Sequence, residues 1–320
     1  IHDGEGPEYT TIVLLGANLG IADTANVIRL NNLVNRLGLD VSSTGGIISW
    51  ATELYEKGII DDTITGEPLR FGDYDLAVRL IEAMAKREGF GALLAESCHA
   101  AEGLNDPKGD YLTAIKGLPQ SAPHDCRYIK GFALGIAMSS RGADHLRSRP
   151  TLEVLDLPPE LLREIYGEDV DPDPTSYETK EKVLAVHEDI YAAVDAMGIC
   201  KFVCHGFNSP KLLKYEHFSA LLEKAFGAKF SPSELAAAGR RIVDVERALL
   251  NRFGVRKEHD TLPRRYFDEP MPHGMAKGHK IDREKFAMMR DRFYHLHGWT
   301  EEGMVTEERV AELTSPWGTK

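Results

Sequence analysis

The segment "AVDAMGICK" (Ala193–Lys201) repeats the plan of "LVNRLGLD" (Leu33–Asp40), and this repeat decides the interpretation of the fold. In each copy an amphipathic helix ends, a polar residue stands three positions before a glycine, and an aliphatic residue follows the glycine. The corresponding positions are Asn35, Gly38, Leu39 and Asp40 in the first copy and Asp195, Gly198, Ile199 and Cys200 in the second. Glycine followed by an aliphatic residue is also the commonest end of a purely structural helix. Two copies that place a carboxylate or a thiol beyond the cap favour a binding turn, because backbone groups and a side chain then converge on one point.

Helical periodicity dominates the rest of the chain. In the segment 23–40, apolar residues recur at three- and four-residue spacing, Asp23 or Thr24 is a suitable N-cap, and Gly38 is a suitable C-cap. Further helices are expected within residues 44–58, 177–197, 231–254 and 282–299, together with two short helices in 74–103 that break around Gly89 and Gly91. Long runs that alternate with a period of two residues are missing. The sequence therefore predicts a mainly α protein.

The chain length and its breaks indicate two domains. It has 320 residues, of which 42% are hydrophobic, enough for more than one core. The best boundary lies in "KGLPQSAPHD", which gives domains 1–117 and 118–320, whereas "GEDVDPDPTS" is expected to be a solvated loop. The polar opening "IHDGEGPEYTT" is typical of a linker, so we expect the chain to be part of a longer polypeptide.

Charge and cysteine content exclude several classes of partner. The net charge of −12 argues against nucleic acid and against an anionic membrane surface, because both require clustered Lys and Arg. No run of 18 apolar residues predicts a transmembrane helix, and no signal peptide is evident. Four cysteines do not make a disulfide scaffold, so reduced thiols and a cytoplasmic location are expected.

At the two turns the sequence resembles the tungsten-containing aldehyde:ferredoxin oxidoreductase family, in which Asp-x-x-Gly-Leu-(Asp/Cys) occurs twice and each copy binds one of two pterin cofactors. The similarity extends in order along essentially the whole chain, through "GPEYTTIVLLGANLGI", "NRLGLDVSSTGG", "TELYEKGII", "APHDCR", "SSRGADHLR" and "DREKFAMMRDRFYHLHGWTEEGMVTEERVAEL". The resemblance implies the family's two helical domains, one with each pterin loop. It also implies that the family's β-rich N-terminal domain is absent from this chain.

By this resemblance, the first pterin loop comprises Asn35, Gly38, Leu39 and Asp40, and the second comprises Asp195, Gly198, Ile199 and Cys200. A pterin edge presents an amino group and ring N–H donors, which a carboxylate accepts as a bidentate pair. The sequence departs from the family at Asn35, where Asp is usual, so this contact loses its charge.

The resemblance gives Cys200 a second role, as the fourth thiolate ligand of a [4Fe–4S] cluster. The family's other three ligands come from an upstream Cys-x-x-Cys-x-x-x-Cys run, which this chain does not contain, so we expect them before Ile1. Cys204 is expected to be a buried thiol without a functional role. Two alternatives are a Cys200–Cys204 disulfide, with both thiols on one helix face, and a zinc site that includes His205 but lacks a fourth ligand.

Acid–base residues are also implied by the family. Its Glu, expected after the tyrosine of "GPEY", is replaced by Thr10, which leaves Glu8 as a candidate on the same side if the segment is extended. Tyr9 could line the pocket. The family's His corresponds to His145 of "RGADHLR", with His124 of "APHDCR" as a second candidate; surface or cap roles remain alternatives for both.

The leading hypothesis is therefore an enzyme with a tungsten (or molybdenum) bis-pterin and a [4Fe–4S] cluster, which oxidises a small aldehyde with water to a carboxylic acid. Electrons would pass to ferredoxin or an electron-transfer subunit, and a missing N-terminal domain or segment would be a further partner. A homo-oligomer is left open. The alternatives are an aryl-CoA (benzoyl-CoA) reductase-type catalytic subunit and a non-catalytic helical subunit with the family fold. Thr10 in place of the family's Glu is consistent with either alternative.

Overall fold

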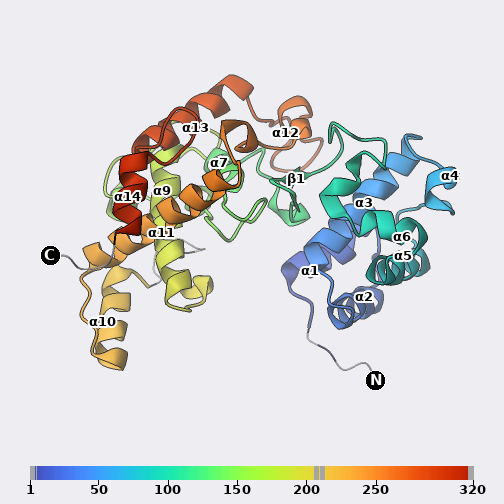
Figure 1. The fold of residues 1–320 in the computed structure, drawn as a ribbon, viewed down its shortest axis with the longest axis horizontal. Helices are drawn as coiled ribbons and strands as arrows, with labels where there is room; N and C mark the ends of the chain where they lie inside the picture. The colour runs from blue at the N-terminus through green and yellow to red at the C-terminus, as the bar shows by residue number, and fades with distance from the viewer. Residues whose placement is uncertain (1–3, 5, 205–208, 210–212, 316–320) are drawn as a thin grey trace. The chain divides into compact units, whose positions relative to one another are not determined.

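The computed structural model describes residues 4, 6–204, 209 and 213–315. The chain divides into two compact units (Figure 1). The first consists of Ile1–Asp125, Gly142–Asp144 and Leu262–Glu269, and the second of Cys126–Arg141, His145–Thr261 and Pro270–Lys320. The sequence boundary between residues 117 and 118 stays a prediction, since the compact units exchange short segments rather than dividing at one point.

Helices build the first unit. Its elements are α1 (Tyr9–Leu15), η1 (Ala17–Leu19), α2 (Thr24–Arg36), α3 (Val41–Glu56), α4 (Asp62–Thr65), α5 (Tyr74–Lys86), α6 (Gly89–Leu94), η2 (Ser97–Ala101), β1 (Ala114–Ile115), β2 (Leu118–Pro119), η3 (Ala122–His124) and α12 (Arg264–Asp268). The strands β1 and β2 pair antiparallel, with Ala114 opposite Pro119. The core lies between α2, α3 and α5, where the apolar stripe of α2 is buried through Val27, Leu30 and Val34.

Helix α1 crosses α3 so closely that only glycine fits at the crossing point. A Cβ atom on Gly45 would lie 2.7 Å from the carbonyl oxygen of Leu14, far inside van der Waals contact. Glycine in a helix costs about 1 kcal/mol relative to alanine, so here this cost is offset by the packing of the two backbones. The crossing fixes α1 against the start of α3.

The second unit is built around one buried helix. Its elements are α7 (Lys130–Met138), η4 (Leu152–Leu155), α8 (Pro159–Tyr166), α9 (Lys180–Ala196), η5 (Lys201–Val203), α10 (Tyr215–Phe226), α11 (Pro232–Arg252), η6 (Lys257–His259), α13 (Arg283–His297) and α14 (Glu307–Thr314). Helix α9 packs against α7, α11 and α13 (Figure 1). It meets α11 at Gly239, where a Cβ atom would lie 2.0 Å from the carbonyl oxygen of Asp189.

The mainly α prediction is confirmed, and most predicted helix ends are correct. Asp23 caps α2 by accepting from the Asn26 amide, and Ser231 forms a capping box with Glu234 at the start of α11. In the described residues, strand structure is confined to β1 and β2 and one isolated bridge between Cys204 and Leu213.

Several local expectations were wrong. Helix α3 begins at Val41 rather than near Thr44, because the Asp40 carboxylate caps it. Gly91 lies inside α6, whose backbone crosses close to Ala83. Residues 9–15 form α1, so Tyr9 and Thr10 are helical and only Glu8 is extended, as the N-cap.

Within the described residues, no single helix is long and apolar enough to span a bilayer; Tyr9–Leu19 and Thr24–Arg36 reach that length only together, and they are bent by 114°.

Candidate functional site: two matching helix ends

The repeated sequence folds into the same turn twice. In the first unit, the Gly38 amide donates to Asn35 O at 3.1 Å and the Leu39 amide donates to Val34 O at 3.1 Å. This pair of bonds is a Schellman motif, in which a left-handed residue ends the helix and satisfies its last carbonyls. Gly38 is that residue, with φ +70°.

The second unit contains the matching turn. The Gly198 amide donates to Asp195 O and the Ile199 amide donates to Val194 O, both at 3.1 Å, and φ of Gly198 is +68°. Exposure follows the same order in both turns: the polar residue, the glycine and the final residue are exposed, while the aliphatic residue is half-buried. The internal repeat is therefore a repeat of three-dimensional structure.

The final residue of each turn also has the same backbone conformation but a different task. Asp40 (φ −73°, ψ 124°) is the N-cap of α3, and its Oδ2 accepts from the Ser43 amide at 2.6 Å. Cys200 (φ −66°, ψ 129°) is the N-cap of η5, makes no side-chain cap bond, and is an exposed free thiol. A capping carboxylate is thus fixed at the first turn and an accessible sulfur at the second.

Two cations hold Asp195 at the second turn. Lys201 Nζ donates to Asp195 Oδ2 at 2.8 Å, and Arg147 Nη1 donates to the same oxygen at 3.3 Å. Both cations are buried, with side-chain exposures of 10% and 5%, whereas Asp195 is 40% exposed. Asn35, its counterpart at the first turn, makes a long contact of 3.5 Å from its Nδ2 to Asn31 Oδ1.

His145 belongs to the second unit and is largely buried. Burial lowers its pKa to about 4, and the positive charges of Arg149, Lys201 and Arg141 act in the same direction. Its imidazole is therefore neutral at physiological pH, so one ring nitrogen can accept a proton. Lys201 links this histidine electrostatically to the second turn.

The remaining acid–base candidates lie in the first unit. His124 is buried in η3, with Nδ1 3.0 Å from Ser121 Oγ, and η3 packs against α1. Glu8 and Tyr9 form the exposed start of α1, where 66% of Tyr9 is accessible. Because α1 begins at Tyr9, the segment is not extended through Thr10, so the condition for placing Glu8 on the same side as Thr10 is not met.

Cys200 of the second turn and Cys204, four positions later, do not share a helix face. Cys200 is exposed, whereas Cys204 is buried at the end of η5, where burial raises its thiol pKa to about 12. Neither cysteine is disulfide-bonded in this structure. His205, the further residue of the zinc alternative, lies outside the described residues.

The described residues fit a pterin better than they fit a complete metal site. Among the described residues, no atom lies within 4 Å of where a Cβ atom of Gly38 or Gly198 would be, which leaves room there for a flat ring. Asp195 adds an exposed carboxylate, the acceptor that a pterin edge needs. By contrast, groups of three or more His, Cys, Asp or Glu residues able to bind a metal are missing from the described part of the chain, so Cys200 would contribute only one cluster ligand.

Sequence reasoning missed Arg147 and Lys201 as partners of Asp195. Lys201 directly follows Cys200, so its position in the repeat was an available signal. Arg147 lies 48 positions from Asp195 and no local pattern connects them.

The family model and the curated relatives that match this chain are all oxidoreductases or subunits of oxidoreductases. The family model "Aldehyde ferredoxin oxidoreductase, domains 2 & 3" matches residues 1–314. A tungsten-containing aldehyde ferredoxin oxidoreductase of Pyrococcus furiosus is 37% identical over 98% of this chain and 49% of its own length. The aliphatic sulfonate oxidoreductase, WOR-like subunit, of the same organism is 30% identical over 97% of this chain and 46% of its own length. The chain thus spans about half the length of these curated relatives.

A solved structure shows the same fold. The active site complex BamBC of benzoyl coenzyme A reductase, in complex with 1,5-dienoyl-CoA, matches with a TM-score of 0.70 and 20% identity, over 97% of this chain and 50% of that one.

Proposed function

The chain belongs to the aldehyde ferredoxin oxidoreductase family, and we propose that it carries the pterin-binding turns and one cluster ligand of a tungsten (or molybdenum) bis-pterin enzyme. In this proposal the enzyme oxidises an aldehyde with water to a carboxylic acid, releasing two protons and two electrons. The electrons leave through a [4Fe–4S] cluster to ferredoxin or a partner subunit. The observation that carries the proposal is the exposed Asp195 carboxylate and Cys200 thiol on the Gly198 turn, whose backbone repeats that of the Gly38 turn; a Schellman turn alone also ends α3 at Gly58.

The two turns have separable roles. The Gly38 turn would hold the first pterin through its backbone, Asn35 and Asp40, while the Gly198 turn would hold the second through Asp195. Cys200, five positions after Asp195, would place a cluster thiolate beside the second pterin. When bound, the bis-pterin metal would take two electrons from the substrate and the cluster would pass them on singly.

His145 is the proposed acid–base residue. Its neutral imidazole can accept one of the two protons, because its pKa of about 4 keeps one nitrogen unprotonated at neutral pH. Burial of the ring restricts its exchange with bulk water. His124 remains a second candidate, and Glu8 and Tyr9 remain candidates from the first unit.

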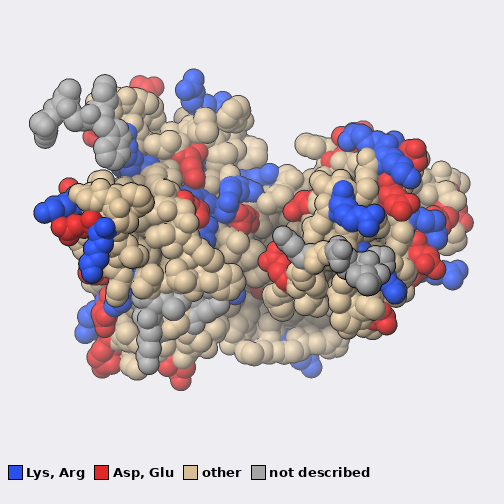
Figure 2. Space-filling model, turned by 90° about the horizontal axis from the view of Figure 1, so that it is seen from below, with Lys and Arg blue, Asp and Glu red and all other residues tan. Residues whose placement is uncertain are grey.

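Charge and thiol chemistry support the proposed setting. A net charge of −12, with acidic and basic side chains interspersed on the face in Figure 2, suits a small-molecule enzyme with a protein partner better than nucleic acid or a membrane surface. None of the four cysteines is disulfide-bonded, which suits the proposed cytoplasmic location. The ferredoxin-type partner, the N-terminal domain, any homo-oligomer and the location are all part of the proposal.

The deciding experiment is anaerobic turnover of the intact protein with a viologen dye as electron acceptor. We expect dye reduction with simple aliphatic or aromatic aldehydes, carboxylic acid as product, and two dye molecules reduced per aldehyde. Absence of turnover in metal-loaded protein across such a panel would contradict the proposed reaction.

One observation favours a second candidate, an aryl-CoA reductase-type catalytic subunit. Thr10 stands where the resemblance expects Glu, and threonine is not a general base at neutral pH. Dearomatisation of an aryl-CoA thioester by the reduced protein, without aldehyde oxidation, would select this alternative.

A further inference from the structure

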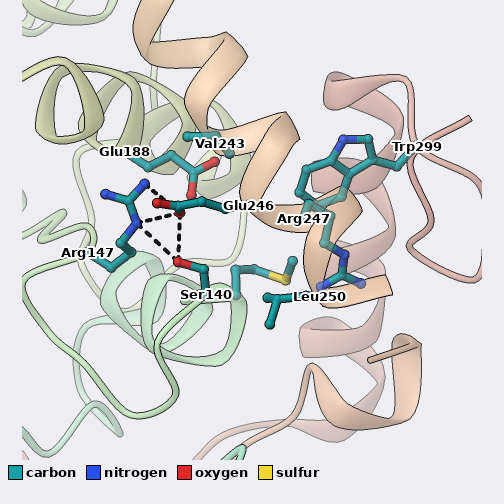
Figure 3. Close-up of a pocket in the computed structure, with 9 residues that line it drawn as sticks. Ser140, Arg147, Glu188, Val243, Glu246, Arg247, Leu250 and Trp299 are labelled. Carbon is teal, nitrogen blue, oxygen red and sulfur yellow. Dashed lines mark hydrogen bonds and ion pairs between the residues drawn. The ribbon is translucent and has the colours of Figure 1, made fainter. Parts of the chain in front are cut away.

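Arg147 occupies a buried position between three elements of the second unit. Ser140 follows α7, Glu246 belongs to α11, and Asp195 ends α9. The guanidinium reaches all three side chains although only 5% of the Arg147 side chain is exposed (Figure 3 shows Ser140 and Glu246).

The Glu246 side of the guanidinium is tightly fixed. Arg147 Nε donates to Glu246 Oε2 at 2.9 Å, and Nη2 lies 2.6 Å from the same oxygen. Ser140 Oγ donates to this oxygen at 2.7 Å and accepts from Arg147 Nε at 3.2 Å. Because a guanidinium is planar and rigid, fixing two of its nitrogens also fixes the direction of the third.

That third nitrogen, Nη1, points to Asp195. It donates to Oδ2 at 3.3 Å, and Lys201 Nζ donates to the same Oδ2 at 2.8 Å. The hydrogen bonds that Asp195 makes with other described side chains all use Oδ2, on a side chain that is 40% exposed. Both cations therefore bind Oδ2, so that among the described side chains Oδ1 is left to accept from a ligand at the Gly198 turn.

Burying the Arg147 guanidinium costs desolvation free energy unless an opposite charge pairs with it, and Glu246 already supplies one such charge. Glu246 and Asp195 are exposed to similar degrees, 35% and 40%, so the buried guanidinium is paired with two carboxylates that both reach solvent. This arrangement is typical of a support for an exposed acceptor rather than of a closed structural ion pair.

We propose that Arg147 is a positioning residue that orients the Asp195 carboxylate toward the hydrogen-bond donors of the second pterin. The inference rests on the proposed function. It assigns Arg147 no contact with the cofactor: Arg147 acts through Asp195, and Glu246 and Ser140 act through Arg147.

The test compares pterin and tungsten content per chain in intact, anaerobically purified variants. Arg147→Met and Asp195→Asn should each retain pterin roughly tenfold more weakly than wild type, as expected for loss of a charge-assisted hydrogen bond. The double variant should retain as much pterin as the worse of the two single variants, because both substitutions remove the same interaction. Additive losses would contradict the inference.

Arg240→Met is the matched control. Like Arg147, Arg240 of α11 is an arginine paired with an α9 carboxylate, since its Nε donates to Asp189 at 2.9 Å, but it lies away from the turn. It should lose thermal stability yet keep its pterin. Arg147→Lys, which keeps one donor for Asp195, should retain more pterin than Arg147→Met at a similar unfolding temperature.

Two failures can be told apart. If wild-type protein contains pterin and Arg147→Met contains as much as Arg240→Met, the inference is wrong and the proposed function stands. If wild-type protein contains neither pterin nor tungsten, the proposed function fails, and this role for Arg147 fails with it.

Discussion

Gly38 and Gly198 adopt the same left-handed backbone conformation, with φ of +70° and +68°, at the ends of two helices that belong to different units. Each is the fifth residue of an equivalent Schellman turn, and each leaves open space where a side chain would be. The turns differ in the residue that follows: Asp40 caps a helix, whereas Cys200 presents a thiol. The same backbone turn therefore presents a helix-capping carboxylate in the first unit and an exposed thiol in the second.

Alanine substitutions at two neighbouring glycines of α3, Gly45 and Gly46, test how closely α1 packs against α3. Gly45→Ala should destabilise the protein by about 1–3 kcal/mol, because its Cβ atom would lie 2.7 Å from Leu14 O. Gly46→Ala is the control: its Cβ atom would meet only Pro119 Cβ, at 3.4 Å, so alanine should be neutral or stabilise by about 0.5–1 kcal/mol. Urea unfolding of both variants measures the difference. Equal effects would contradict the close crossing of the two helices.

Cys200→Ser tests the proposed cluster ligand. An exposed serine hydroxyl is a poor ligand for iron, so we expect iron and acid-labile sulfide to fall while the far-ultraviolet circular dichroism spectrum stays unchanged. Cys98→Ser, at a half-buried free thiol in the first unit, is the control and should keep its iron. Wild-type iron content in Cys200→Ser would show that the ligand assignment is wrong.

His145→Ala tests the proposed proton acceptor. Turnover should fall by about 10²–10⁴-fold, the usual contribution of a general acid–base group, with tungsten content unchanged. Because the folded pKa is lowered to about 4, His145 stays neutral from pH 5 to pH 8 and should add no acidic limb to the wild-type profile in that range. A limb centred near pH 6.5 that disappears in His145→Ala would contradict the buried, neutral state. Retained activity would move the role to His124 or another residue.

His297 makes the stability of the second unit depend on pH. Its side chain is fully buried, with Nε2 3.1 Å from Glu188 Oε1 and Nδ1 3.6 Å from Asp244 Oδ1. Burial opposes the charged imidazole, but the two carboxylates outweigh it and raise the His297 pKa. A raised histidine pKa gives stability that is complete below the unfolded value near 6.5 and is lost as pH rises through the folded value.

The free energy of unfolding of wild type, minus that of His297→Gln, should therefore fall as pH rises above about 6.5, by at most about 1.4 kcal/mol per pH unit. Taking the difference removes the contributions of other titrating groups. Chemical denaturation at several pH values measures it, and a difference that is constant or grows with pH would contradict the ion pairs.

The sequence predicted the features that local chemistry determines. Helix ends at Asp23, Gly38 and Ser231 were identified because caps and left-handed glycines leave short signals. The repeated turn was identified for the same reason. The start of α3 was misplaced because Asp40, expected only as a pterin ligand, is also its cap.

Features that depend on distant residues were not predictable. Arg147 meets Glu246 across 99 positions, and neither residue carries a pattern that points to the other. The opposite exposures of Cys200 and Cys204 follow from the turn between α9 and η5, which helical spacing does not describe. The assignment of His145 came from the family resemblance, and its neutral state follows only from the surrounding burial and charge.

The central claim is that the two turns hold two pterins around one metal. The most direct measurement is the pterin and metal content of the intact protein after anaerobic purification, by fluorescence of the oxidised pterin and by elemental analysis. The account predicts two pterins for each tungsten or molybdenum atom, and loss of the second pterin in a variant that carries Gly198→Val and Asp195→Asn. Protein that folds normally and contains neither pterin nor either metal would contradict it.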